Sequence, residues 1–364
     1  MNYLIYRNDG IGDLIVSTPL INFIRKNDKN SYITLICSKR NIELAHLLKS
    51  NCLIDDLINI DEYDTYFKKF TFCRIVNSLK IDHIIILKSS NFSLILSKLV
   101  KVTSHKNTCI SGVVPLNLSK NGKNRYKPDK LLVNQIFDNY EVVDCRNDYV
   151  YSKDIQMLEH YSNLVNQIFK SSSKNEIVDI PYFEPKELQV NEDFIILIKK
   201  ILCQKKMMLF HFDEKWDATD YSLDEIKSLL NIFIDSFGGF IFMTHGLIKN
   251  KYYDHIINNY ELKNYLTPTQ DYKIYMSKIN ENLFSFPNLK LNELMYLISN
   301  SDFVIEPHGA LTHIASIYDK PVIDLVPKDK INFLSKWKPK SKKMKQIVID
   351  HKDEIIENMN NFIS

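Results

Sequence analysis

The chain has 364 residues, of which 45% are hydrophobic and 25% are charged. At about 150 residues per domain, this length predicts two domains with a core each. The 47 basic and 44 acidic residues leave a net charge of +3, which excludes a general nucleic-acid binder and leaves any anionic partner to a local patch. No apolar stretch approaches the length of a membrane span, and the early charge of Arg7 argues against a secretory signal.

The cysteine and glycine content gives two further indications, one on disulfides and metal sites and one on the backbone. The six cysteines are scattered without a Cys-x-x-Cys pair, which predicts free thiols in a reducing cytoplasm and no zinc site. Only eight glycines occur, well below the usual share of about 7%. We therefore expect each glycine to hold a position that other residues fill poorly.

The first half of the chain alternates between strand and helix patterns. A buried strand at 2–7 leads through a Gly-containing turn into a helix. Further strands are predicted at 33–38, 57–60 and 82–90, with helices at 42–50 and from 91 onward. This alternation is typical of βαβ units and a parallel sheet. The tract from 150 to 180 is helical and then polar, and Pro181 and Pro185 mark an interdomain connection.

The same pattern restarts in the second half. Strands are predicted at 207–212, 239–246, 302–307 and 320–326, and helices at 222–237, 291–301 and 352–363. Ser222 followed by Glu225 predicts a capping box. We expect an N-terminal domain over 1–185, a second domain over 186–345, and a C-terminal helix in 346–364. Ligands of such α/β folds bind at the carboxyl ends of the strands, which here predicts a cleft between the domains.

The first strand ends at a loop that contains Gly10 and Gly12. A dinucleotide fingerprint is disfavoured, because its third glycine position holds Ile15 and no carboxylate ends the second strand. A P-loop is absent. What remains is Asp13 at the start of a helix, where it is either a helix cap or an exposed functional carboxylate.

The opening segment resembles glycosyltransferase family 9, the heptosyltransferase family. Arg7, Gly12, Asp13, Thr18 and Pro19 match that family's amino-terminal motif. The similarity continues through 33–48 and 82–105, resumes at 210–216 and 289–325, and is weak between 115 and 205. It implies the GT-B fold, with two Rossmann-like α/β domains whose parallel sheets face an interdomain cleft.

The resemblance also implies an activity. Members transfer a sugar with inversion from a nucleotide donor, usually ADP-heptose, without a metal or another cofactor. Asp13 would be the general base that deprotonates the acceptor hydroxyl, in agreement with the chemistry of an exposed carboxylate. Donor-binding positions would be Gly12, Lys215 and Gly246, together with the loop His308, Gly309, Ala310, Leu311, Thr312 and His313. Lys215 would neutralise charge on the leaving diphosphate.

The donor loop departs from the family pattern, which is Asp-Ser/Thr-Gly-x-x-His. His313 matches the closing histidine. However, the acidic position holds His308, the Ser/Thr position holds Gly309, and the glycine position holds Ala310. The donor therefore stays open between ADP-heptose, CMP-Kdo and a UDP- or GDP-sugar. His313 has a second interpretation as an interior histidine, and Lys215 as a solvated lysine. A zinc pair is disfavoured because no further ligands accompany the two histidines.

Residues 98–130 are rich in lysine and arginine, with Asp129 as the only acid. This stretch is either a solvated face or the site of an anionic acceptor such as a lipopolysaccharide core, with Arg125 and Lys127 as contacts. Lys88 and Ser89, at a strand end, are further acceptor candidates. Nucleic acid is disfavoured because aromatic residues are sparse there. The expected location is the cytoplasm, with peripheral contact at the inner membrane as an option.

Two other classes stay open at this point. A nicotinamide oxidoreductase is disfavoured by the missing glycine and ribose carboxylate. A non-catalytic relative that binds a nucleotide sugar or lipid is disfavoured by the presence of Asp13.

Overall fold

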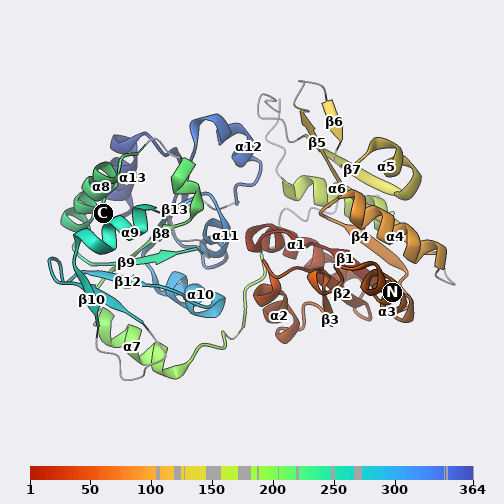
Figure 1. The fold of residues 1–364 in the computed structure, drawn as a ribbon, viewed down its shortest axis with the longest axis horizontal. Coiled ribbons are helices and arrows are strands. Elements are labelled where there is room, and N and C mark those ends of the chain that lie inside the picture. Colours follow the sequence, from red (N-terminus) through yellow and green to blue (C-terminus); the bar gives the residue numbers. More distant parts are fainter. Residues whose placement is uncertain are drawn as a thin grey trace. The chain divides into compact units, whose positions relative to one another are not determined.

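The computed structural model describes the chain except for residues 104–106, 119–123, 127, 145–156, 171–181, 187, 204, 219–220, 247–250, 266–272, 340, 342 and 364. The chain forms two compact units (Figure 1). The first comprises Met1–Lys186 and Ser335–Lys338, and the second Glu187–Leu334 and Pro339–Ser364. Each has its own sheet and its own core.

The sheet of the first unit has the strand order β3-β2-β1-β4-β5-β6, and β7 also pairs with β5. All pairs are parallel except β5 with β6. The strands are β1 (Asn2–Tyr6), β2 (Tyr32–Cys37), β3 (Asp56–Asn59), β4 (His83–Ile86), β5 (Cys109–Leu118), β6 (Asn124–Tyr126) and β7 (Asn139–Asp144). Strand order reverses beside β1, so its carboxyl end is where ligands of such sheets bind.

Two sets of helices accompany this sheet. The helices α1 (Ile11–Asn27), α2 (Ile42–Ser50) and α6 (Met157–Phe169) form one set, in which α1 contacts α6. The other set is α3 (Tyr66–Ser78), α4 (Asn91–Thr103) and α5 (Lys130–Ile136), which contact one another in that order. Apolar residues of this second set, such as Phe72, Leu94 and Val133, share a core cluster with Leu4 and Ile84 of the strands.

The sheet of the second unit has the order β10-β11-β12-β9-β8-β13-β14-β15. Its strands are β8 (Met207–Phe212), β9 (Phe240–His245), β10 (Leu262–Asn264), β11 (Tyr275–Ser277), β12 (Leu283–Phe286), β13 (Phe303–Pro307), β14 (Val322–Val326) and β15 (Met344–Val348). The pairs from β12 to β15 are parallel, and β10 and β11 add an antiparallel edge.

The helices of this unit are α7 (Glu192–Leu202), α8 (Leu223–Phe237), α9 (Lys251–Asn259), α10 (Leu291–Asn300), α11 (Ala310–Ile317), α12 (Ile331–Ser335) and α13 (Lys352–Ile363). The predicted capping box is confirmed, since Ser222 Oγ accepts the Glu225 amide and the Glu225 carboxylate accepts the Ser222 amide. Within the described residues, no helix is long and apolar enough to cross a membrane.

The helix predicted at 352–363 is confirmed as α13, which spans Lys352–Ile363. The wider segment 346–364 that was assigned to the C-terminal helix is wrong at its start, because residues 346–348 belong to strand β15. The strand forms because Met344 and Ile347 are buried while the segment pairs in parallel with β14. The five described cysteines are free, as predicted; Cys145 lies outside the described residues.

Candidate functional site

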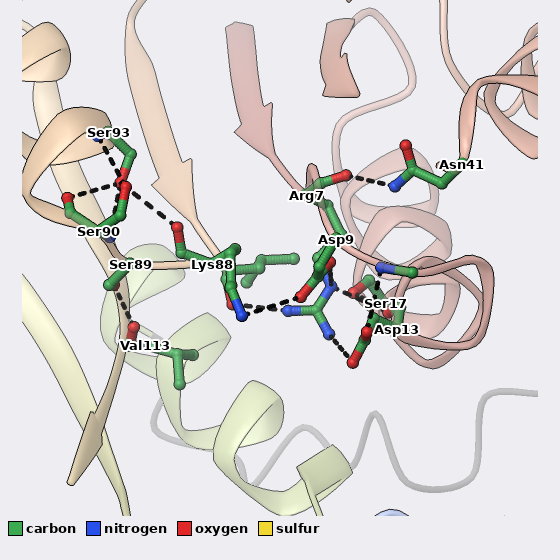
Figure 2. Close-up of polar contacts among 12 residues, drawn as sticks. Arg7, Asp9, Asp13, Ser17, Asn41, Lys88, Ser89, Ser90, Ser93 and Val113 are labelled. Atoms are coloured by element: carbon green, nitrogen blue, oxygen red, sulfur yellow. Dashed lines mark hydrogen bonds and ion pairs between the residues drawn. The ribbon is translucent and has the colours of Figure 1, made fainter. Parts of the chain in front are cut away.

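The carboxyl end of β1 holds a buried arginine that orients Asp13. Arg7 is only 1% exposed, and its Nη2 lies 3.2 Å from Asp13 Oδ1 while its Nε donates to the Asp13 backbone oxygen at 3.0 Å. The other carboxylate oxygen, Oδ2, accepts the Gly10 amide at 3.2 Å (Figure 2). Asp13 nevertheless stays 34% exposed. Its carboxylate is therefore both a helix-capping group and a fixed, accessible base candidate.

The backbone around this cluster is itself fixed. Asn41 Nδ2 donates to the Arg7 backbone oxygen at 2.7 Å, and Arg7 Nη1 donates to Leu87 O at 2.7 Å. The absent side chain at Gly10 matters here, because a Cβ would lie 3.2 Å from Asp13 Oδ2. Gly12 lies in the first turn of α1, next to Asp13.

A second carboxylate, Asp9, lies on the other side of Arg7. Its Oδ1 is 3.2 Å from Arg7 Nε, and its Oδ2 is 3.8 Å from Lys88 Nζ. Burial raises the pKa of Asp9, and the Arg7 guanidinium opposes that shift. Figure 2 shows Lys88 directed toward this cluster. Ser89 is instead buried and donates its hydroxyl to Val113 O, so among the two acceptor candidates Lys88 is the one that reaches the cluster.

In the second unit, Lys215 lies against the turn before α11. Its Nζ donates to His308 O and is 3.4 Å from Asp213 Oδ2, yet the side chain remains 41% exposed. Gly309 permits this approach, because a Cβ there would lie 2.9 Å from Lys215 Nζ and 3.3 Å from Pro307 O. Its φ of −165° is ordinary extended backbone. The need for glycine is therefore steric: it leaves room for the ammonium group.

His308 is held by a buried carboxylate. Its Nδ1 lies 2.8 Å from Asp324 Oδ2, which also accepts Gln346 Nε2 at 2.9 Å, and Asp324 is fully buried. When His308 donates its Nδ1–H to Asp324, the second ring nitrogen, Nε2, is not engaged by this contact. Asp324 therefore supplies an acid that holds His308 from behind.

A second acid, Glu306, is linked to Asp324 through Thr312. The Thr312 hydroxyl lies 2.6 Å from Glu306 Oε1 and 3.0 Å from Asp324 Oδ1, but it has one hydrogen to donate. Glu306 is fully buried, and desolvation raises its pKa well above 4.5. A protonated Glu306 whose Oε1 donates to Thr312, which in turn donates to Asp324, makes both of these short contacts compatible with the single hydroxyl hydrogen, while Glu306 Oε2 has no hydrogen-bond partner among the described residues.

Replacing Glu306 with glutamine should remove a pH dependence of stability. The folded-state pKa of Glu306 is raised, so its contribution is fully present below pH 4.5 and is lost as the pH rises toward the folded value. Relative to wild type, Glu306→Gln should gain roughly 3 °C in Tm per pH unit above that point until the folded pKa is passed. Thermal unfolding from pH 4 to 8 measures this. A Tm difference that does not change with pH, as expected for the exposed control Glu357→Gln, would contradict it.

The remaining predicted donor residues divide into two groups. Gly309 and Ala310 are partly exposed, whereas Leu311, Thr312 and His313 are buried. Burial lowers the pKa of His313 strongly, so its imidazole is neutral at pH 7. Its ring centroid is 5.6 Å from that of His308. Gly246 follows β9 and donates its amide to Phe212 O.

The structure does not describe the side chains of Arg125 and Lys127, the acceptor contacts predicted in the basic stretch. Lys127 lies outside the described residues. Arg125 is in β6, where only its backbone is described, and its residue pairs with Asn117. Lys101 instead forms an ion pair with Asp138 at 2.7 Å.

Sequence reasoning missed Asp9, Asp213, Glu306 and Asp324 as parts of these clusters. A signal was present for two of them. Glu306 and Asp324 are acids inside the apolar strands FVIEP and VIDLV, and they are paired in register on β13 and β14. Ionisable residues are rarely fully buried without partners. Within the described part of the chain, no group of three or more histidine, cysteine or acidic residues could hold a metal ion.

No protein-family model matches the sequence, and no curated protein does either. Solved structures do match in fold. The glycosyl transferase family 9 protein of Veillonella parvula superposes with a TM-score of 0.69 at 11% identity, covering 100% of this chain and 97% of that one. The E. coli ADP-heptose LPS heptosyltransferase II gives 0.67 at 14% identity, covering 100% and 98%.

The fold is also shared with proteins of another kind. A putative UDP-N-acetylglucosamine 2-epimerase from Listeria monocytogenes gives a TM-score of 0.54 at 9% identity, covering 100% of this chain and 87% of that one. Both likenesses extend over the whole chain. The chain therefore has the GT-B fold of the glycosyltransferase family 9 structures, as its amino-terminal motif predicts.

Proposed function

We propose that this protein is an inverting glycosyltransferase that moves a sugar from a nucleotide donor to a cell-envelope saccharide. The observation that carries the proposal is the Asp13 carboxylate, which Arg7 and the Gly10 amide hold in place while a third of it stays exposed. As the acceptor hydroxyl attacks the anomeric carbon, Asp13 takes its proton. The bond from that carbon to the donor phosphate breaks, and the nucleoside phosphate leaves with the electron pair.

The second unit supplies groups suited to the donor phosphates. Lys215 Nζ, the His308 imidazole and the start of α11 gather around Gly309. A cation and helix amides stabilise charge on a leaving diphosphate without a metal ion. ADP-heptose is the lead donor, with heptose as the transferred sugar, because solved structures with this fold include an ADP-heptose LPS heptosyltransferase. The acceptor would be an anionic lipopolysaccharide-core or related saccharide, encountered at the cytoplasmic face of the inner membrane.

The altered donor loop keeps other nucleotide sugars in consideration. An imidazole replaces a carboxylate at position 308, and this changes which nucleotide or sugar hydroxyls the loop can bind. CMP-Kdo and UDP- or GDP-sugars are the alternatives, and a nucleotide-sugar epimerase shares the fold. A non-catalytic protein that only binds a nucleotide sugar is also an alternative, but such a protein would not need an oriented carboxylate like that of Asp13.

A thermal-shift panel tests the donor class. ADP-heptose, CMP-Kdo, UDP-N-acetylglucosamine, a GDP-sugar and NAD are compared, and the true donor at 100 times its Kd should add about 2.7 kcal/mol of stability. We expect ADP-heptose to give the largest shift and NAD none. A shift with NAD alone, or with none of the sugar nucleotides, would contradict the proposal. Epimerisation of UDP-N-acetylglucosamine in the absence of an acceptor would reassign the activity.

A further inference from the structure

An apolar surface lies on the first unit, on the side of α3, α4 and α5 that faces away from the sheet. We call it the outer apolar face. It consists of Phe67 and Phe70 of α3, Phe92, Ile95, Leu99 and Val102 of α4, and Leu131 of α5. The exposure is large: 91% for Phe67 and 70% for Val102. The α4 members recur every three or four residues and so form one stripe along the helix, where a surface helix normally carries polar residues.

These helices lie side by side, so their exposed residues belong to one surface. Lys69 Nζ of α3 is 5.1 Å from the centroid of the Phe92 ring of α4. At the other end of that pair, Asn77 Nδ2 donates to Thr103 Oγ1 at 2.7 Å. On the opposite side of α4, Lys98 Nζ donates to Gln135 O of α5 at 3.4 Å. Contiguous exposed apolar surface of this kind marks an interaction site.

The charge of the same helices indicates the partner. The three helices carry six basic residues and no acidic one, although the whole chain is nearly balanced. The basic residues are Lys68, Lys69, Arg74, Lys98, Lys101 and Lys130. The acids next to the helices are Asp64, Asp129 and Asp138, which leave the surface net positive. Apolar side chains interspersed with lysine and arginine are typical of surfaces that lie in the interface of an anionic bilayer.

We propose that the outer apolar face docks this protein on an anionic lipid surface. Its apolar side chains would enter the headgroup region while its cations contact lipid phosphates. A second copy of this chain is a poorer occupant, because a symmetric contact would bring two positively charged faces together. This inference deepens the proposed function and rests on it for the nature of the acceptor.

The position of the face suits a lipid-anchored acceptor. Helix α4 begins three residues after Lys88, the lysine that reaches Asp9 beside Arg7 and Asp13. The reciprocal hydrogen bonds between Ser90 and Ser93 fix the start of that helix (Figure 2). Docking through Phe92 therefore brings the Lys88 end of the sheet to the bilayer surface, where the saccharide of a glycolipid is exposed.

Flotation with vesicles tests the proposal in the absence of any donor or acceptor. Wild-type protein is mixed with vesicles of phosphatidylcholine alone or with 30% phosphatidylglycerol. We expect binding to the anionic vesicles that weakens with salt, and little binding to the neutral ones. The double variant Ile95→Gln/Leu99→Gln should lower the partition coefficient at least about tenfold. Lys98→Gln should lower it about fivefold.

A control uses two apolar residues of the second unit that are more exposed than Ile95 and Leu99, which are 49% and 48% exposed. Ile196 and Ile279 are 61% and 63% exposed, and Ile196→Gln/Ile279→Gln should bind vesicles as wild type does. Equal binding by both double variants would overturn the proposal. So would ultracentrifugation that shows a dimer for wild type and a monomer for Ile95→Gln/Leu99→Gln alone. Thermal shifts with the sugar nucleotides, unchanged in this variant, separate a failure of docking from a failure of the proposed function.

Discussion

Asp13→Asn should lower kcat by about 10²–10⁴-fold and leave donor affinity within about twofold of wild type. The amide keeps the shape of the side chain and can still contact Arg7, but it cannot take a proton from the acceptor hydroxyl. Both carboxylate oxygens of Asp13 accept hydrogen bonds, one from Arg7 and one from the Gly10 amide, and asparagine can keep only one of them, so we expect a moderate loss of Tm. Transfer assays at saturating donor, with donor binding measured by thermal shift, separate the two effects. Retention of more than a few per cent of wild-type turnover would exclude Asp13 as the base.

The neighbouring carboxylate provides a matched control. Asp9 contacts the same arginine, but it is less exposed than Asp13, at 15% against 34%, and it also lies near Lys88. We expect Asp9→Asn to reduce kcat less than tenfold. A large loss for Asp9→Asn together with a small loss for Asp13→Asn would move the role of general base to Asp9.

Much of the fold could be predicted from local sequence patterns. Helix 42–50 and strand 207–212 were placed at their observed ends, because the helix has apolar residues at helical spacing and the strand is a continuous apolar run. Strand β15 was missed, since its alternating pattern KMKQIVI carries too few apolar residues to be distinguished from a helix start. The antiparallel edge β10–β11 was missed for a different reason, since each strand has only three residues.

The candidate site could be predicted only in part, because its chemistry depends on contacts between distant residues. The motif identified Asp13, but not the Arg7 and Asp9 contacts that orient the cluster. In the second unit, the loop from His308 to His313 was found through its resemblance. Its supporting acid, Asp324, lies 16 residues further along the chain, on the neighbouring strand. The pairing of β13 with β14, which places Glu306 opposite Asp324, is what brings Asp324 next to this loop, and the sequence alone does not give that register.

Lys215→Gln should lower kcat by about 10²–10³-fold, because it removes the positive charge that we propose stabilises the leaving diphosphate. Glutamine can still donate a hydrogen bond to His308 O, so the loop should keep its conformation. The loss should appear mainly in kcat and less in the KM for the donor, since charge on the leaving group is greatest in the transition state. Steady-state kinetics with varied donor measure this. The matched control is Lys278→Gln, whose lysine is 40% exposed against 41% for Lys215.

Gly309→Ala tests the same role while keeping the lysine. The new Cβ would lie 2.9 Å from Lys215 Nζ, at the end of a flexible side chain, and 3.3 Å from Pro307 O, so the ammonium group should move much more than the backbone. We expect a loss of kcat between those of wild type and Lys215→Gln, with little change in Tm. In the double variant Gly309→Ala/Lys215→Gln, the alanine should add almost nothing, because the group it displaces is already gone. Fully additive losses would show that Gly309 acts on the donor directly, and wild-type kcat in Lys215→Gln would show that the charge is not used.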